Sequence, residues 1–157
     1  MYTRILVPTD GSGVSALAER AAIDFARACG ASIVALAVGQ PYPPPASTEG
    51  AMVIDAALET EALQAWATRN ATRVAGAAQA AGVAATAVTD IAYAPADAIV
   101  EQARRHGCDL IFIGSHGRRG LSRLLAGSVA QDVLAAATVA VMVLRPQPQQ
   151  LRAEDDT

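Results

Sequence analysis

The sequence contains no lysine, because all 12 basic residues among its 157 are arginine. This absence excludes Schiff-base catalysis and a Walker-type phosphate loop, both of which need a lysine amine. Aromatic residues make up only 4% of the chain, which argues against RNA recognition by base stacking. The formal net charge is −3, so no overall positive field attracts nucleic acid or an anionic membrane.

Patterns for disulfides, metal clusters and membrane spans are also missing from the sequence. Cys29 and Cys108 form no CxxC pair, and two histidines alone cannot give zinc-ligand spacing. The longest apolar stretch, residues 133–144, is too short to cross a bilayer, and the first residues resemble a strand instead of a signal peptide. We therefore expect a soluble cytoplasmic protein with reduced cysteines.

What the chain does contain is alanine, with 37 copies, and an alternation of apolar runs with helical segments. The apolar runs predict five strands, at residues 5–7, 32–38, 83–91, 109–113 and 139–144. Helices are expected between them, at residues 14–28, 51–81, 95–106 and 128–137. Strands that are apolar throughout are typical of a parallel sheet that is buried on both faces, so the sequence predicts an α/β fold with helices on both sides.

The first predicted helix is amphipathic. The residues expected to face the sheet are Val14, Leu17, Ala21, Phe25 and Ala28. The residues expected to face solvent are Glu19, Arg20, Asp24 and Arg27. Gly30 follows where a C-terminal cap belongs.

A single domain of residues 1–146 accounts for this pattern, since 157 residues is a typical length for one domain. Residues 39–50 contain four prolines and are expected to form a loop within that domain. Residues 147–157 are polar and acidic, and we expect them to form a flexible tail.

In open parallel sheets, ligands bind beyond the carboxyl ends of the strands, at the switch in strand order. The segment after the fourth strand carries Gly114, Gly117 and Gly127, and glycines let the backbone approach an oxyanion closely. Ser128 then begins a helix, whose free N–H groups favour phosphate, and Arg118 adds positive charge to the loop. The alternative is that the glycines form turns and the arginines a solvated surface patch.

Asp10 follows the first strand and is expected to lie across the sheet edge from this loop. Its carboxylate would hold a divalent cation beside phosphates, or it would cap the first helix through its side chain. His116 would contact phosphate or lie in solvent. Neither a Ser–His–Asp nor a Cys–His arrangement is recognisable, so no catalytic residue is assigned.

Three motifs occur together in the sequence. They are residues 5–12 (ILVPTDGS), residues 109–117 (DLIFIGSHG) and the spacing Gly-x2-Gly-x9-Gly-Ser from residue 114 to 128. Their combination resembles the universal stress protein family, specifically its ATP-binding branch. The resemblance extends over nearly the whole chain, to Arg145. It implies a Rossmann-like, three-layer open sandwich of the adenine nucleotide alpha-hydrolase-like type, with five parallel strands in the order 3-2-1-4-5.

The same resemblance implies that ATP binds with Mg²⁺ or Mn²⁺ at the carboxyl edge of the sheet. By residue match, Asp10 would lie near the ribose and the metal, Val38 near the adenine and Gly114 near the ribose. The phosphates would be held by Gly117, Gly127, Ser128 and Val129. The expected binding set is completed by Pro8, Thr9, Ile113 and Arg118.

Many members of the family form homodimers by pairing their last strands, which corresponds to residues 139–144 here. That strand begins with Val139-Ala140-Val141, where the family usually has a Cys-Pro-Val-like segment. The preferred interpretation is a homodimeric ATP sensor in the stress response. The alternatives are a slow metal-dependent ATPase or phosphotransferase, for which the sequence offers no base to activate water, and a dimeric scaffold that has lost nucleotide binding.

Overall fold

The computed structural model describes residues 1–41, 56–115 and 128–145. The elements follow in the order β1 (Arg4–Thr9), α1 (Gly13–Cys29), β2 (Ser32–Gly39), α2 (Ala56–Ala80), β3 (Ala85–Ile91), α3 (Pro95–Arg105), β4 (Leu110–Gly114), α4 (Ser128–Ala136) and β5 (Ala140–Leu144). The predicted alternation of strands and helices is therefore confirmed for the described residues. The proline-rich segment, most of the glycine- and arginine-rich loop, and the acidic tail lie outside them.

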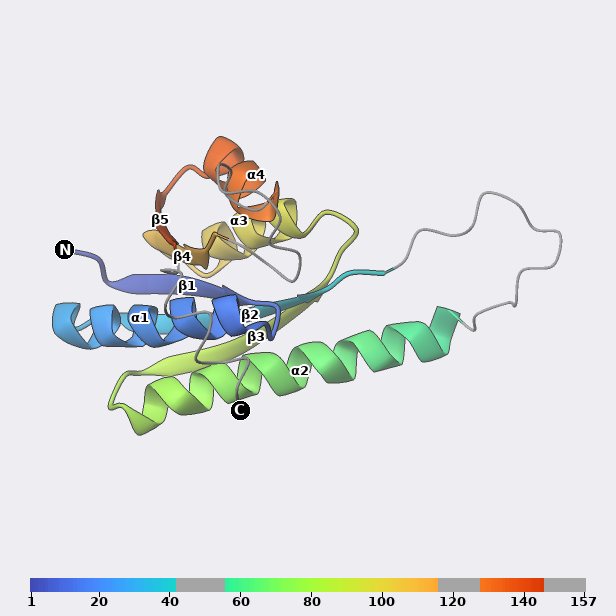
Figure 1. The fold of residues 1–157 in the computed structure, drawn as a ribbon, viewed down its shortest axis with the longest axis horizontal. Coiled ribbons are helices and arrows are strands. Elements are labelled where there is room, and N and C mark those ends of the chain that lie inside the picture. Colours follow the sequence, from blue (N-terminus) through green and yellow to red (C-terminus); the bar gives the residue numbers. More distant parts are fainter. Residues whose placement is uncertain (42–55, 116–127, 146–157) are drawn as a thin grey trace, which may run out of the picture.

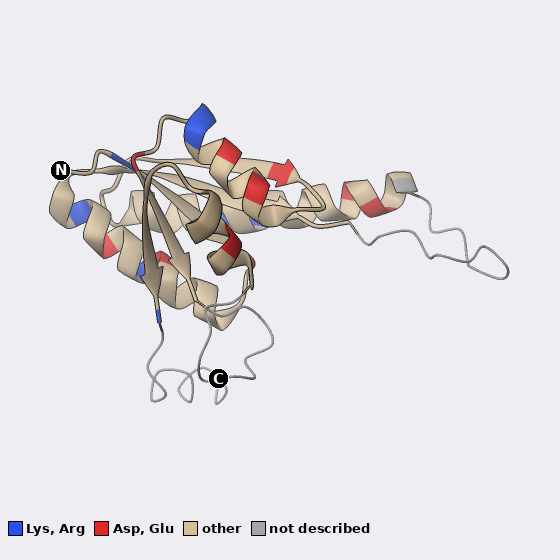
Figure 2. Ribbon diagram, turned by 90° about the horizontal axis from the view of Figure 1, so that it is seen from above, with Lys and Arg blue, Asp and Glu red and all other residues tan. Residues whose placement is uncertain are grey.

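The five strands form one parallel sheet in the order β3-β2-β1-β4-β5, as the resemblance implied. Helices α1 and α2 lie on one face of this sheet, and α3 and α4 lie on the other (Figure 1). Most of the charged residues are on the helices, whereas the strands are largely uncharged along their length (Figure 2). The expected three-layer α/β sandwich is confirmed.

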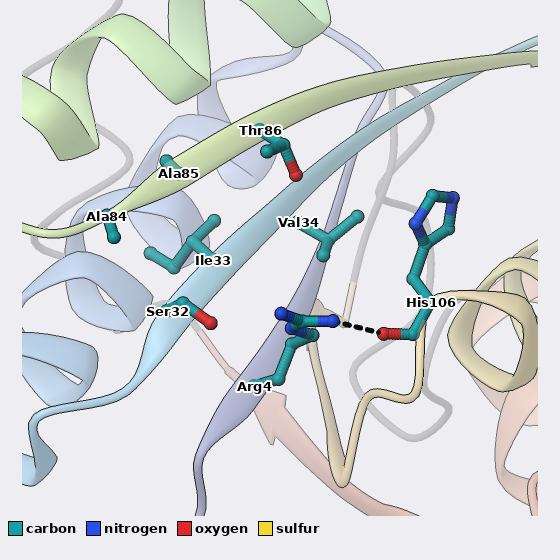
Figure 3. A pocket seen from close by; sticks show the side chains of 8 residues that line it. All are labelled: Arg4, Ser32, Ile33, Val34, Ala84, Ala85, Thr86 and His106. Carbon is teal, nitrogen blue, oxygen red and sulfur yellow. Dashed lines mark hydrogen bonds between the residues drawn. The ribbon is translucent and has the colours of Figure 1, made fainter.

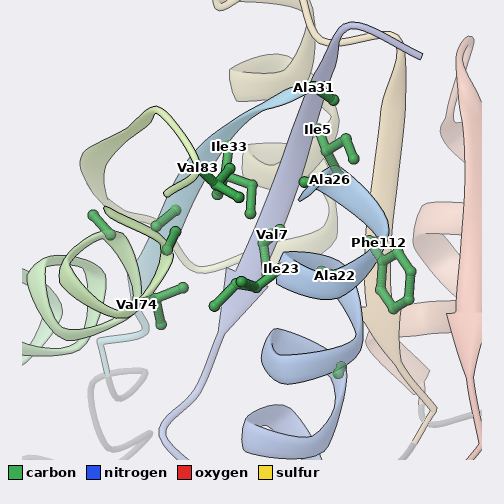
Figure 4. Packing of buried hydrophobic residues seen from close by; sticks show 14 of the residues in the cluster. Ile5, Val7, Ala22, Ile23, Ala26, Ala31, Ile33, Val74, Val83 and Phe112 are labelled. Atoms are coloured by element: carbon green, nitrogen blue, oxygen red, sulfur yellow. The ribbon is translucent and has the colours of Figure 1, made fainter. Parts of the chain in front are cut away.

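Two large hydrophobic clusters, and a small one formed by Ala37, Ala67 and Ala71, lie between the three layers. Successive strand residues point to opposite faces, so Ile5 and Val7 of β1 pack toward α1 and α2, whereas Leu6 packs toward α3 and α4. Figure 4 shows the first cluster, in which Phe112 and Val74 lie on either side of β1 and α1. The helices contribute mostly alanine, and this small side chain lets them lie close to the sheet.

The prediction that the strands are buried on both faces of the sheet is confirmed for the inner strands and wrong for the outer ones. Strands β1, β2 and β4 are buried along most of their length. In contrast, β3 and β5 have half-buried and exposed residues throughout. Each outer strand pairs with a single neighbour, so the helical layers do not cover it fully.

The buried face of α1 also differs from the predicted one. Its buried residues are Ser15, Ala18, Glu19, Ala22, Ile23 and Ala26. The bulkier Leu17 and Phe25 are half-buried at the sides of the helix, and Ala28 is exposed. The prediction, made from helical spacing alone, was wrong because a neighbouring stripe that includes Ala18, Ala22 and Ala26 packs against the sheet. The small alanine side chains let α1 lie close to the strands.

The boundaries of the helices follow the expected local chemistry. Gly30 adopts the left-handed conformation (φ 71°) after α1, and Pro95 occupies the first turn of α3. Both cysteines are free, and Cys108 is buried. Within the described part of the chain, no helix is both long enough and apolar enough to cross a membrane.

Candidate functional site

Strands β1 and β4 are adjacent at the centre of the sheet, but they pair over only part of their length. Their pairing consists of Ile5 with Leu110 and Leu6 with Ile111. Beyond these two pairs, the last residues of both strands have no partner on the other strand. Because the chain continues from β1 to β2 on one side and β4 lies on the other, this is the switch point where open α/β sheets bind ligands.

Three of the predicted site residues come from adjacent strands at this edge. Thr9, the last residue of β1, is level with Ala37 in the β1–β2 register, so Asp10 leaves β1 at the edge where Val38 lies near the end of β2. Gly114 ends β4 on the opposite side of β1. The topology therefore brings Asp10, Val38 and Gly114 to one edge of the sheet.

The turn after β1 holds the Asp10 carboxylate through one of its oxygens. Asp10 Oδ1 accepts a hydrogen bond from the Ser12 N–H at 2.9 Å. The N-cap of α1 is Ser12, whose Oγ accepts from the Ser15 N–H at 3.1 Å, so the interpretation of Asp10 as the helix cap is wrong. Asp10 Oδ2 accepts no hydrogen bond from the residues that the structure describes. This oxygen is therefore the atom of Asp10 that is open to coordinate a cation or to accept a hydrogen bond from a ligand.

A buried polar network lies directly behind this turn. Glu19 of α1 is 4% exposed and accepts the Thr9 hydroxyl at 2.6 Å and the Ser15 hydroxyl at 3.0 Å. Arg73 of α2 donates to both carboxylate oxygens of Glu19, at 2.8 and 3.0 Å. The Gly11 N–H in turn donates to Thr9 Oγ1 at 3.1 Å, so the network reaches the turn itself.

Burial by itself would raise the pKa of Glu19, but the hydrogen bonds from Arg73, Thr9 and Ser15 and the charge of Arg73 outweigh it. The net pKa of the carboxyl lies below its ordinary value of 4.5. Glu19 is therefore an ionised group inside the protein. The prediction that Glu19 faces solvent is wrong, because its position four residues after Ser15 places it on the buried stripe of α1.

Gly114 lies against the first turn of α1. A Cβ atom at Gly114 would lie 3.2 Å from both the Cγ1 atom and the carbonyl oxygen of Val14, and 3.5 Å from the Ala18 Cβ. Helix packing is therefore sufficient to explain why glycine stands here. The predicted approach of a ribose to Gly114 stays a prediction.

The remaining predicted residues differ in accessibility. Pro8, Val38 and Val129 are half-buried, and Ile113 is buried, whereas Ser128 is exposed at the first position of α4. The predictions for His116, Gly117, Arg118 and Gly127 fall outside the described residues.

Asp90 is a further carboxylate near this edge, at the end of β3. Asp90 Oδ2 accepts from the Gln102 side chain at 2.7 Å, and Oδ1 accepts from the Ile91 N–H at 2.8 Å. Both of its oxygens are thus engaged within the fold. No group of three or more His, Cys, Asp or Glu residues within the described ranges is arranged to hold a metal ion.

A cavity of about 320 Å³ lies at the opposite edge of the sheet, between the amino ends of the strands and the end of α3 (Figure 3). Its lining residues are Arg4, Ser32, Ile33, Val34, Ala84, Ala85, Thr86 and His106. The Arg4 guanidinium lies at the rim and donates to the carbonyl oxygen of His106 at 3.0 Å. None of the predicted site residues lines this cavity, so it lends no support to the predicted site.

Comparison with known proteins gives one consistent family. The profile described as the Universal stress protein family matches residues 1–145. Universal stress protein MJ0531 of Methanocaldococcus jannaschii is 34% identical over 147 residues, which cover 92% of this chain and 83% of that protein.

Two solved structures share the fold over almost their whole length. The hypothetical protein MJ0577 superposes with a TM-score of 0.75 at 25% identity, covering 94% of this chain and 98% of that one. UspA from Lactobacillus plantarum has a TM-score of 0.69 at 28% identity, covering 92% and 98%. More distant members, at 18 to 24% identity, were solved with adenine nucleotides: one in complex with cAMP, one from Arabidopsis thaliana with AMP bound and one from Archaeoglobus fulgidus in complex with dAMP.

Proposed function

Because the chain belongs to the universal stress protein family, we propose that it binds ATP with Mg²⁺ or Mn²⁺ and acts as a homodimeric nucleotide sensor in the stress response. One observation carries the proposal: Asp10, Val38 and Gly114 lie at the carboxyl ends of three adjacent strands, at the switch point of the sheet. Ligands of doubly wound α/β sheets bind at such a point. The binding domain is residues 1–146, with residues 147–157 as a tail, and the protein acts in the cytoplasm.

The relatives solved with cAMP, AMP and dAMP support an adenine nucleotide as the ligand. The adenine would lie near Val38 and the ribose between Asp10 and Gly114. A triphosphate needs more donors than a monophosphate. Here the donors would be the backbone N–H groups at Gly117, Gly127 and Val129, the last of which lies in the first turn of α4. The exposed Ser128 hydroxyl would donate as well, and the positive charge of Arg118 would attract the phosphates. Pro8, Thr9 and Ile113 would shape the base of this site.

The chemistry of Asp10 fits a divalent cation. A carboxylate oxygen is a suitable ligand for Mg²⁺ or Mn²⁺, and Asp10 Oδ2 accepts no hydrogen bond from the described residues. Since these residues include no cluster of three metal ligands, the phosphate oxygens and water would complete the coordination. The cation would thus arrive with the nucleotide and neutralise its phosphates.

The proposed homodimer would use β5. This strand is at an open edge of the sheet, and its residues Ala140–Leu144 carry no charge, proline or glycine that would prevent pairing. Pairing of two copies about a two-fold axis would satisfy both edges at once.

Titration calorimetry with MgATP tests the binding. We expect one site per chain in the wild type, and loss of binding in Gly127→Val, where a side chain would obstruct the phosphates. Gly76→Ala serves as a matched control, because a Cβ at Gly76 meets nothing within 4 Å. A wild type that gives no heat, and no competition with an ATP analogue at millimolar concentration, would refute the proposal.

A second measurement separates a sensor from an ATPase. Steady-state release of ADP should stay at the background level in the wild type and in Asp10→Ala if the protein only senses the nucleotide. ADP release above background that is abolished in Asp10→Ala would instead identify a metal-dependent ATPase.

A further inference from the structure

The hydroxyl of Thr9, one of the proposed binding residues, is occupied within the protein. We infer that Glu19 and Arg73 are positioning residues, which act through Thr9 to hold the turn that carries Asp10 in the geometry needed by a nucleotide. This inference rests on the proposed function, and it gives Thr9 a supporting part in the site instead of a ligand contact through its side chain.

The contacts form a continuous chain from α2 to the turn. Arg73 donates to both oxygens of the Glu19 carboxylate, which fixes the carboxylate plane. Glu19 Oε1 accepts the proton of the Thr9 hydroxyl at 2.6 Å. Since the single proton of that hydroxyl is committed to Glu19, its lone pairs face the other donors, and the Gly11 N–H donates to one of them at 3.1 Å. The Glu19 carboxylate thereby fixes the orientation of the Thr9 hydroxyl, whose oxygen accepts the hydrogen bond from the Gly11 N–H.

Burial makes this chain of bonds hard to replace. Thr9 is 5% exposed and Ser15, whose hydroxyl lies within hydrogen-bonding distance of both Thr9 and Glu19, is 8% exposed. Water is therefore largely excluded from the network, and a lost partner would leave a buried polar group unsatisfied. Arg73 closes the network on its outer side, with half of its side chain in solvent.

Helix α2 supports the turn at a second point, one helical turn before Arg73. Gly11 lies so close to Asn70 that a Cβ on Gly11 would be 2.8 Å from Asn70 Oδ1. The Asn70 amide is itself held, because its Nδ2 donates to the Trp66 carbonyl oxygen at 3.0 Å. Helix α2 thus flanks the turn between β1 and α1, and Asp10 is the residue of that turn with a carboxylate oxygen left for a ligand.

Amide hydrogen exchange followed by NMR tests the positioning without any nucleotide. In Glu19→Leu, exchange at Gly11 and Ser12 should accelerate about tenfold, the effect expected for one lost hydrogen bond. Arg73→Met should accelerate the same two amides severalfold, and the double variant should be no faster than Glu19→Leu, because both changes act on one network. Arg69→Met, on the exposed side of α2, is the matched control and should leave them unchanged.

Unchanged exchange at Gly11 and Ser12, or an equal acceleration of all β1 amides, would overturn the inference, since the network would then be a general element of stability.

MgATP affinity gives the second readout: we expect it to fall about tenfold in Glu19→Leu and to stay at the wild-type value in Arg69→Met. Equal affinity in all variants would also overturn it. A wild type that binds no nucleotide contradicts the proposed function instead, and the exchange data then decide whether the turn is held.

Discussion

Gly114 and Gly76 have contrasting surroundings, although both are glycines within regular structure. A Cβ on Gly114 would meet Val14 at 3.2 Å, so Gly114→Ala should push β4 and α1 apart and lower the free energy of unfolding by about 1–2 kcal/mol. Gly76 lies within α2 with nothing near it, so Gly76→Ala should raise this free energy by about 0.5–1 kcal/mol. Urea unfolding measures both values, and effects of the same sign would contradict the close packing of Gly114 against Val14.

Glu19 makes stability depend on pH in a defined direction. Its pKa is lower in the folded chain than the ordinary value of 4.5, so its ionised form stabilises the fold above that pH. The contribution is lost as the pH falls through the folded pKa. We expect the difference in unfolding free energy between the wild type and Glu19→Gln to be largest near neutral pH and to shrink below about pH 4.5. A difference that is independent of pH would show that the charge of Glu19 contributes nothing.

At the scale of elements, α1 depends on Ser12 for its start. The Ser12 hydroxyl accepts the Ser15 N–H, and the Ser12 N–H donates to Asp10, so one residue serves both the helix and the turn. Ser12→Ala should destabilise the protein by about 1 kcal/mol. Thermal unfolding measures this loss, with Thr72→Ala, on the exposed side of α2, as the control that should not destabilise. Equal stability of Ser12→Ala and the wild type would mean that the cap is dispensable.

The predictions at the level of elements succeeded where the signal is local. The run from Ile5 to Val7 predicted β1, Pro95 predicted the start of α3, and Gly30 predicted the end of α1. Apolar runs, proline and glycine act through their own backbone and nearest neighbours, so the sequence displays them directly. The orientation of α1 could not be predicted in this way, because it depends on which side chains fit against a sheet assembled from distant segments.

At the scale of the whole molecule, the proposed dimer depends on which backbone groups of β5 are free. The Ser115 N–H donates to the Leu144 carbonyl oxygen at 2.8 Å, so Leu144 directs its backbone groups toward β4. These groups alternate along a strand, so Met142 also faces β4, whereas Val141 and Val143 face the open edge.

Val141→Pro removes a donor from that open edge and should shift a wild-type dimer toward monomer without loss of the fold. Met142→Pro removes a donor from the β4–β5 ladder instead and should destabilise the fold itself. Light scattering and circular dichroism measure the two effects. A wild type that is monomeric at tens of micromolar, or a Val141→Pro variant that stays fully dimeric, would refute this interface.

Part of the candidate site could be predicted from the sequence in the same way, and part could not. Asp10, Val38 and Gly114 were predicted at one edge because Asp10 and Gly114 follow apolar runs and Val38 ends one, and parallel strands end at the same edge of their sheet. The binding roles of these residues, and those of Gly117, Arg118 and Gly127, are still predictions. The Glu19–Arg73 pair was missed because a charged residue on a helix normally lies in solvent.

The sequence by itself determined the order of strands and helices, the parallel α/β class and the segments that end at the carboxyl edge, since all of these follow from short-range apolar patterns and turn residues. The tertiary structure alone decided that Glu19 is buried, because its partner Arg73 is 54 residues away in the chain and meets it only when α2 packs beside α1. It also decided which strands are half-exposed, since that depends on their place in the sheet and not on their composition. An isolated segment carries its own periodicity, but the burial of a charge depends on a partner that folding brings to it.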